Sequence, residues 1–140
     1  MSEACACETR SVMILPCSGA SNVGQIANQA ALELRAEGYG RMYCLVGIGA
    51  HIQPMVQSAR DVDRIVAIDG CEVCCARKLL EHLEIRPHQH VVVTQLGIEK
   101  SYDVTWPAEQ VVAVKKAIRG PEAAKGGVSS SGQKGRTCCA

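Results

Sequence analysis

The chain has 140 residues, which is enough for one domain with a sizeable core, and its formal net charge is only +1. With no basic surface and only 3% aromatic residues, it lacks the features typical of proteins that bind nucleic acids or anionic membranes. No apolar run is long enough to cross a bilayer, so we expect no nucleic-acid partner and no membrane association.

The cysteine content is the most unusual feature of the composition. Nine cysteines would indicate a disulfide scaffold in a small secreted protein, but the number is odd. Residues 2–10 are polar, and the apolar residues 12–15 are too few to form the hydrophobic region of a secretion signal. We therefore expect a cytoplasmic protein with reduced thiols, in which clustered cysteines indicate metal or redox chemistry.

The first predicted elements are a strand and a helix. Residues 12–15 form a short, continuous apolar run ending at Pro16, which is typical of a buried strand. Apolar residues between positions 23 and 34 follow helical spacing. Ser21 or Asn22 is a plausible N-cap, and Gly38 ends the helix.

The middle of the chain repeats this pattern. Residues 42–46 read as a second strand, and the apolar spacing over residues 52–59 predicts a short helix with Pro54 in its first turn. Residues 65–68 are the third predicted strand. The helix expected after it, marked by residues 73–83, ends before Pro87.

The last elements are a strand at residues 91–93 and a helix over residues 107–118 that Pro107 opens and Gly120 stops. Four strands alternating with helices predict a single α/β domain with a four-stranded parallel sheet flanked by helices, in the order 2-1-3-4. This is a three-layer architecture of the Rossmann-like or flavodoxin-like kind.

The ends of the chain differ in composition from its centre. Residues 1–10 read as a flexible leader, residues 11–120 as the α/β domain, and residues 121–140 as a disordered tail rich in Gly, Ser and Lys. The tail carries Cys138 and Cys139, and the leader carries Cys5 and Cys7.

Cysteines follow three of the predicted strands. Cys17 lies just past the first strand and Cys71 just past the third, whereas Cys44 ends the second strand only if residues 45–50 form a loop. In a helix starting near Asp69, Cys71 would share a face with Cys74 at three residues or with Cys75 at four. Sites in open parallel sheets form at the carboxyl ends of the strands.

These thiols predict a metal site. Cys17, Cys44, Cys71 and one of Cys74 and Cys75 supply four sulfurs, which suits a tetrahedral Zn²⁺ site with bonds of about 2.3 Å. The alternative is that each cysteine is a small buried hydrophobic residue.

Four motifs resemble one known family. They are, in chain order, Cys17-Ser18-Gly19-x-Ser21-x-x-Gly24-x-Ile26-Ala27-Asn28, Cys44-Leu45-x-Gly47-Ile48-Gly49, Ile68-Asp69-Gly70-Cys71-x-x-x-Cys75-Ala76-x-Lys78 and Leu96-Gly97-Ile98-x-Lys100. Together they resemble the DGC-domain family over roughly residues 12–119. The resemblance implies zinc binding through four cysteines, which by position are Cys17, Cys44, Cys71 and Cys75. It implies no particular reaction. Gln95 stands where we expect an acidic residue.

Three other hypotheses use the same thiols. Cys71 with Cys74 or Cys75 at a helix start is a candidate redox pair of a thiol/disulfide enzyme. Four thiolates also suit an iron–sulfur cluster. The loop after Cys17 resembles the phosphocysteine loop of sugar-phosphotransferase IIB domains, but that interpretation leaves the other cysteines unexplained.

The remaining polar residues have less specific interpretations. We interpret Asp69 as a cap of the following helix in preference to a catalytic base. His51 is near the expected site, but a capping or surface role is favoured over ligation. His88 and His90 precede the fourth strand, at the opposite edge of the sheet, and are expected to be solvated.

Overall fold

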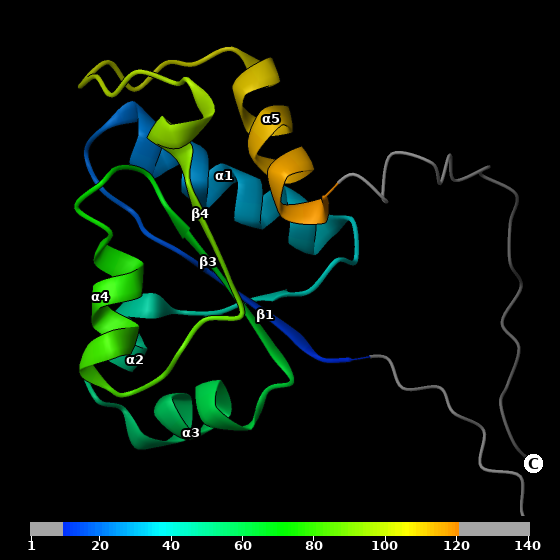
Figure 1. The fold of residues 1–140 in the computed structure, drawn as a ribbon, viewed down its shortest axis with the longest axis vertical. Helices are drawn as coiled ribbons and strands as arrows, with labels where there is room; N and C mark the ends of the chain where they lie inside the picture. Colours follow the sequence, from blue (N-terminus) through cyan, green and yellow to red (C-terminus); the bar gives the residue numbers. More distant parts are fainter. Residues whose placement is uncertain (1–9, 121–140) are drawn as a thin grey trace, which may run out of the picture.

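Four parallel strands form the centre of the molecule, with helices on both faces (Figure 1). The computed structural model describes residues 10–120. The strands are β1 (Val12–Pro16), β2 (Arg41–Met42), β3 (Arg64–Asp69) and β4 (Gln89–Val92). The helices are α1 (Asn22–Ala36), α2 (Leu45–Gly49), α3 (Gln53–Asp61), α4 (Cys75–His82), the 3₁₀ helix η1 (Val93–Leu96) and α5 (Ala108–Arg119).

The sheet order is β2-β1-β3-β4, which confirms the predicted α/β class and strand order. All three pairings are parallel, and the register aligns Pro16 with Ile68 and Asp69 with Val92. The strands therefore all end at one edge of the sheet. None of the helices within residues 10–120 has the length and apolar character needed to cross a membrane.

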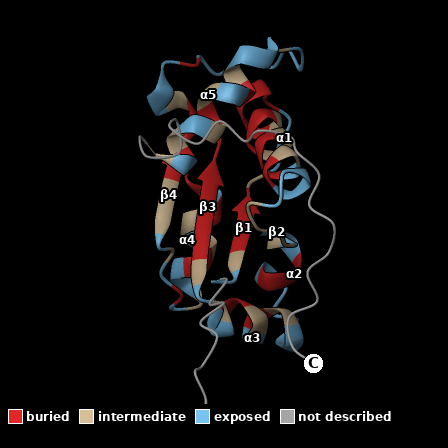
Figure 2. Ribbon diagram, turned by 90° about the vertical axis from the view of Figure 1, so that its right-hand side faces the viewer, coloured by how far each residue is buried: buried red, intermediate tan, exposed pale blue. Residues whose placement is uncertain are grey.

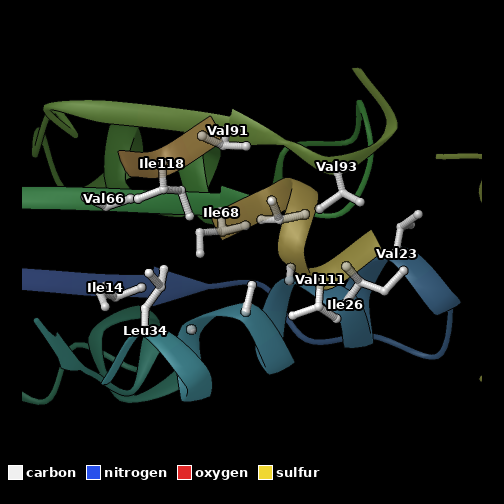
Figure 3. Packing of buried hydrophobic residues seen from close by; sticks show 14 of the residues in the cluster. Ile14, Val23, Ile26, Leu34, Val66, Ile68, Val91, Val93, Val111 and Ile118 are labelled. Atoms are coloured by element: carbon white, nitrogen blue, oxygen red, sulfur yellow. The ribbon is translucent and has the colours of Figure 1, made fainter. Parts of the chain in front are cut away.

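Side chains of the central strands β1 and β3 alternate between two separate hydrophobic cores, one on each face of the sheet. Ile14 of β1 and Ile68 of β3 pack with α1 and α5, as Figure 3 shows. Their neighbours Leu15 and Ala67 point to the opposite face, where α2, α3 and α4 cover them. Successive residues of a strand point to opposite faces, so both faces of these apolar strands are buried (Figure 2).

Two element boundaries differ from the sequence predictions. The second strand is only Arg41–Met42, because the chain turns into helix α2 at residue 45 instead of extending to residue 46. Helix α4 begins at Cys75, so Cys71 precedes the helix. The apolar spacing was correct in both places, but short helices and strands with Gly-rich flanks share the same apolar pattern.

The predicted leader and tail fall on residues 1–10 and 121–140. Apart from Arg10, these segments lie outside the described residues.

Candidate metal centre

A pocket of about 610 Å³ opens at the carboxyl edge of the sheet. Segments that follow β1, β2 and β3 line it, so residues far apart in the sequence meet there. Its lining includes all four cysteines that the family resemblance selects: Cys17, Cys44, Cys71 and Cys75. The adjacent Cys74 is buried and is not part of the lining.

Cys17 is held at the end of β1 by its backbone and by its sulfur. Its N–H donates to the carbonyl of Ile68 (2.8 Å), and its Sγ accepts from the N–H of Gly70 (3.0 Å). Burial raises the pKa of the Cys17 thiol to about 11, although the Gly70 hydrogen bond works in the opposite direction. Without metal, this half-buried thiol is therefore protonated at neutral pH.

Gly70 lets the backbone after β3 lie close to helix α1, because a side chain here would overlap the backbone of α1. A Cβ at this position would lie 2.7 Å from the carbonyl carbon of Val23 and 2.7 Å from the N of Gly24. The turn after β3 thus packs directly against the first turn of α1. Ser21 caps that helix by accepting from the N–H of Gly24 (3.3 Å), as its position in the sequence predicted.

Cys44 reaches the pocket from the start of helix α2. It is the N-cap residue, and its exposed Sγ accepts from the N–H of Gly47 (3.4 Å). The sequence required a loop at residues 45–50 to bring Cys44 to the sheet edge, but a one-turn helix does so instead. A Cβ at Gly47 would lie 2.2 Å from Sδ of Met55, so this glycine lets α2 pack on α3.

Cys71 begins a turn that ends at Cys74, and Cys75 is the first residue of helix α4. The N–H of Cys74 donates to the carbonyl of Cys71 (3.1 Å), and Cys74 has left-handed backbone angles, φ 54° and ψ 50°. The shared helical face expected for Cys71 and Cys75 is therefore wrong, because only Cys75 is helical. Both still line the pocket, where Nζ of Lys100 donates to Sγ of Cys71 (3.5 Å).

Asp69 caps helix α4, as the sequence predicted. Its Oδ1 accepts from the N–H of Ala76 (2.7 Å) and its Oδ2 from the N–H of Arg77 (3.1 Å). Asp69 is only 1% exposed, so these bonds replace the water that a carboxylate would otherwise require. Cys74, not Asp69, occupies the N-cap position, and the carboxylate reaches the helix from the end of β3.

The prediction that His88 and His90 are solvated is correct for His88, which is exposed, but wrong for His90. His90 belongs to β4 and its Nε2 donates to Oδ2 of Asp69 (2.8 Å), with 19% of the side chain exposed. Nδ1 of His88 accepts from the N–H of Ile65 (3.0 Å). The strand begins two residues earlier than its apolar run, so it includes His90, whereas His88 precedes it and bonds to Ile65 of β3. His51 is exposed and does not line the pocket.

Three possible metal ligands gather beside the pocket cysteines. One ligand atom from each of Asp69, Cys74 and His90 lies within 4.8 Å of the other two. Within residues 10–120, no three sulfurs of the pocket cysteines are this close to one another. In a tetrahedral site with zinc–sulfur bonds of about 2.3 Å, the sulfurs are about 3.8 Å apart.

The model of the DGC domain matches residues 13–118, which is most of the chain and includes the four pocket cysteines. This chain belongs to the DGC-domain family. It is also similar to the anaerobic and virulence modulator AnvM of Pseudomonas aeruginosa, with 36% identity over 90 residues, or 64% of this chain and 69% of AnvM. No solved structure matches the chain.

Membership of the DGC-domain family and the cluster of Asp69, Cys74 and His90 both fit a metal-binding protein. Each residue of the tripeptide Asp69-Gly70-Cys71 has its own structural role. Asp69 caps α4, Gly70 allows contact with α1, and Cys71 lines the pocket.

His90 is the site residue that the sequence interpretation missed. The alternation of side chains along the fourth strand could have identified it. In the parallel register His90 is aligned with Ala67, and Asp69 lies two residues further along β3 on the same face. Extending the predicted fourth strand back to residue 89 would have placed the imidazole beside the carboxylate.

Proposed function

We propose that this DGC domain binds one Zn²⁺ through Cys17, Cys44, Cys71 and Cys75. The observation that carries the proposal is that these four cysteines, from three separate segments, line one pocket at the carboxyl edge of the sheet. Four thiolates in a tetrahedral arrangement are a preferred zinc environment.

The surroundings of the sulfurs support thiolate ligands. Four thiolates around Zn²⁺ carry a formal excess of about two negative charges, which needs nearby donors or cations. Cys17 already accepts from the N–H of Gly70, and Cys44 from the N–H of Gly47. The ammonium group of Lys100 lies beside Cys71. Hydrogen bonds to the charged form of a ligand stabilise that form.

Metal binding requires the sulfurs to approach one another. Cys44 and Cys75 are exposed, so their side chains can turn toward the other two sulfurs without displacing core residues. Cys17 is fixed by its bonds to β3, which gives the metal one well-defined anchor. The bound zinc would connect the ends of β1 and β3 with the starts of α2 and α4, which is the role of a closed, four-ligand zinc site.

The experiment is substitution of each cysteine followed by metal analysis. The full chain is used with Cys5, Cys7, Cys138 and Cys139 replaced by serine, because these thiols can bind zinc themselves. Co²⁺ loaded into this protein should give the absorption spectrum of a tetrahedral four-sulfur site. Serine at any of the four pocket cysteines should abolish that spectrum. The variants are Cys17→Ser, Cys44→Ser, Cys71→Ser and Cys75→Ser.

Cys74→Ala is the matched control, because Cys74 adjoins Cys75 but does not line the pocket. It should retain the four-sulfur spectrum. Two results would contradict the proposal. One is a metal-free protein with a disulfide from Cys71 to Cys74 or Cys75, which indicates a redox enzyme. The other is a brown iron–sulfur chromophore in anaerobically purified protein.

A further inference from the structure

A second group of metal-ligand side chains lies beside the four-cysteine pocket but does not belong to it. It consists of Asp69 from the end of β3, Cys74 from the turn before α4, and His90 from β4. One ligand atom of each lies within 4.8 Å of the other two. Asp69 and Cys74 are buried, and neither lines the pocket.

The backbone of Cys74 has an unfavourable conformation, which turns its thiol away from the pocket cysteines. Its φ of 54° lies in the left-handed region, which is unfavourable for a residue with a side chain. Glycine or asparagine would occupy this position more easily. The turn leaves Cys74 only 6% exposed, whereas Cys75 is exposed at the pocket.

The carboxylate of Asp69 is held in place before any metal arrives. The N–H groups of Ala76 and Arg77 fix its two oxygens, and the imidazole of His90 donates to Oδ2. The two backbone N–H donors are outer hydrogen bonds, which orient metal ligands and reduce the reorganisation that binding requires. The His90 bond joins two ligand atoms, so metal replaces it, and the proton leaves Nε2 for solvent or for Nδ1. The distance from His90 Nε2 to Asp69 Oδ2 is 2.8 Å. Zinc between these atoms would widen it to about 3.3 Å, a small movement.

We propose that Asp69, Cys74 and His90 form a second site for a divalent metal of the zinc type. A thiolate, an imidazole and a carboxylate suit Zn²⁺, whereas Mg²⁺ and Ca²⁺ prefer oxygen ligands alone. One thiolate and one carboxylate neutralise the two positive charges, and a neutral assembly is the kind that a buried position tolerates. The four-cysteine site would carry an excess negative charge instead.

Three protein ligands leave a fourth position for water or a small ligand. His90 and Arg77 line a separate pocket of about 480 Å³, and this pocket gives the cluster a path to solvent. The second site is therefore an open site, in contrast to the closed four-sulfur site.

The test counts zinc in the full chain with Cys5, Cys7, Cys138 and Cys139 replaced by serine. After loading with zinc and removal of the excess, this protein should hold two zinc ions per chain. Cys74→Ala and His90→Gln should each hold one and keep the four-sulfur Co²⁺ spectrum. Alanine retains the left-handed strain of Cys74, and glutamine retains an N–H donor for Asp69, so neither variant should unfold.

The reciprocal variant replaces Cys17, Cys44, Cys71 and Cys75 by serine together. It should retain one zinc, which a further Cys74→Ala change removes. If the variant with Cys74→Ala alone holds as much zinc as its parent, the second site does not exist. If the reciprocal variant is unfolded by circular dichroism, the single variants decide alone. A parent with one zinc that Cys74→Ala removes would support the second site and refute the four-cysteine site.

Discussion

Two adjacent cysteines of this DGC domain lie in opposite environments. Cys75 is exposed at a pocket lined by three other cysteines, whereas Cys74 is buried beside a carboxylate and an imidazole. The left-handed turn at Cys74 produces this difference. A pair of neighbouring cysteines therefore need not act together, and the backbone angles of one residue decide which site each thiol can reach.

The two regions also differ in how they balance charge. In the proposed four-cysteine site, the pocket sulfurs would depend on N–H donors and on Lys100, because four thiolates exceed the charge of one zinc ion. In the proposed second site, the buried cluster would need no added cation, because its two negative ligands match the charge of the metal. Substitutions near the turn should therefore affect the pocket and the buried cluster differently. The largest effect is expected at a residue that stabilises the fold itself.

Asp69→Ala should have the largest effect. It removes a buried acceptor from the N–H groups of Ala76 and Arg77 and from His90, and should lower the free energy of unfolding by about 3 kcal/mol. Urea denaturation with a chelator present measures this in the metal-free protein. Glu72→Ala, at an exposed position in the same turn, should change it by less than about 0.5 kcal/mol. Equal effects would show that the cluster has no role in the fold before metal binds.

Gly70→Ala should have the next largest effect on stability. The added methyl group would overlap the backbone of Val23 and Gly24 and should lower the free energy of unfolding by about 2 kcal/mol. The same substitution at Gly19, where a Cβ meets nothing within 4 Å, is the matched control. Thermal unfolding of the two variants compares them directly. An unchanged Gly70→Ala protein would mean that the turn does not depend on contact with α1.

The pH dependence of zinc binding should show whether the pocket thiols are the ligands. Burial raises the pKa of Cys17 to about 11, so at lower pH zinc must displace its proton. In the His90→Gln background, each proton released should raise zinc affinity about tenfold, or about 1.4 kcal/mol, per unit rise in pH. Competition with a chromophoric chelator at several pH values measures the slope. An affinity that does not change with pH would show that Cys17 is not a ligand.

Lys100→Met should have the smallest effect. The ammonium group is exposed, so solvent screens its attraction for the Cys71 thiolate, and its loss should weaken zinc binding about threefold. The weakening should shrink in high salt. Lys78→Met, an exposed lysine outside the pocket, is the control. Isothermal titration of the His90→Gln protein gives the affinity, and a larger loss with Lys78→Met would contradict this assignment.

The short apolar runs and the helical spacing between them were sufficient to predict the four-stranded parallel sheet and its order. Strands buried on both faces must be continuously apolar, and short right-handed connections leave few possible orders. The same logic brought Cys17 and Cys71 to one edge, because parallel strands all end on the same side, whereas Cys44 reaches that edge at the start of helix α2. Family motifs then selected Cys75, which lines the pocket with them.

The sequence by itself thus determined the fold and the four cysteines that line the pocket. Only the tertiary structure decided the environments of Cys74 and His90. Helical periodicity does not apply to residues 71–74, since they form a turn before α4, and the turn's left-handed residue buries the Cys74 thiol. His90 meets Asp69 because the β3–β4 register puts both on one face. Register and turn geometry depend on contacts between distant segments, and a local pattern does not contain them.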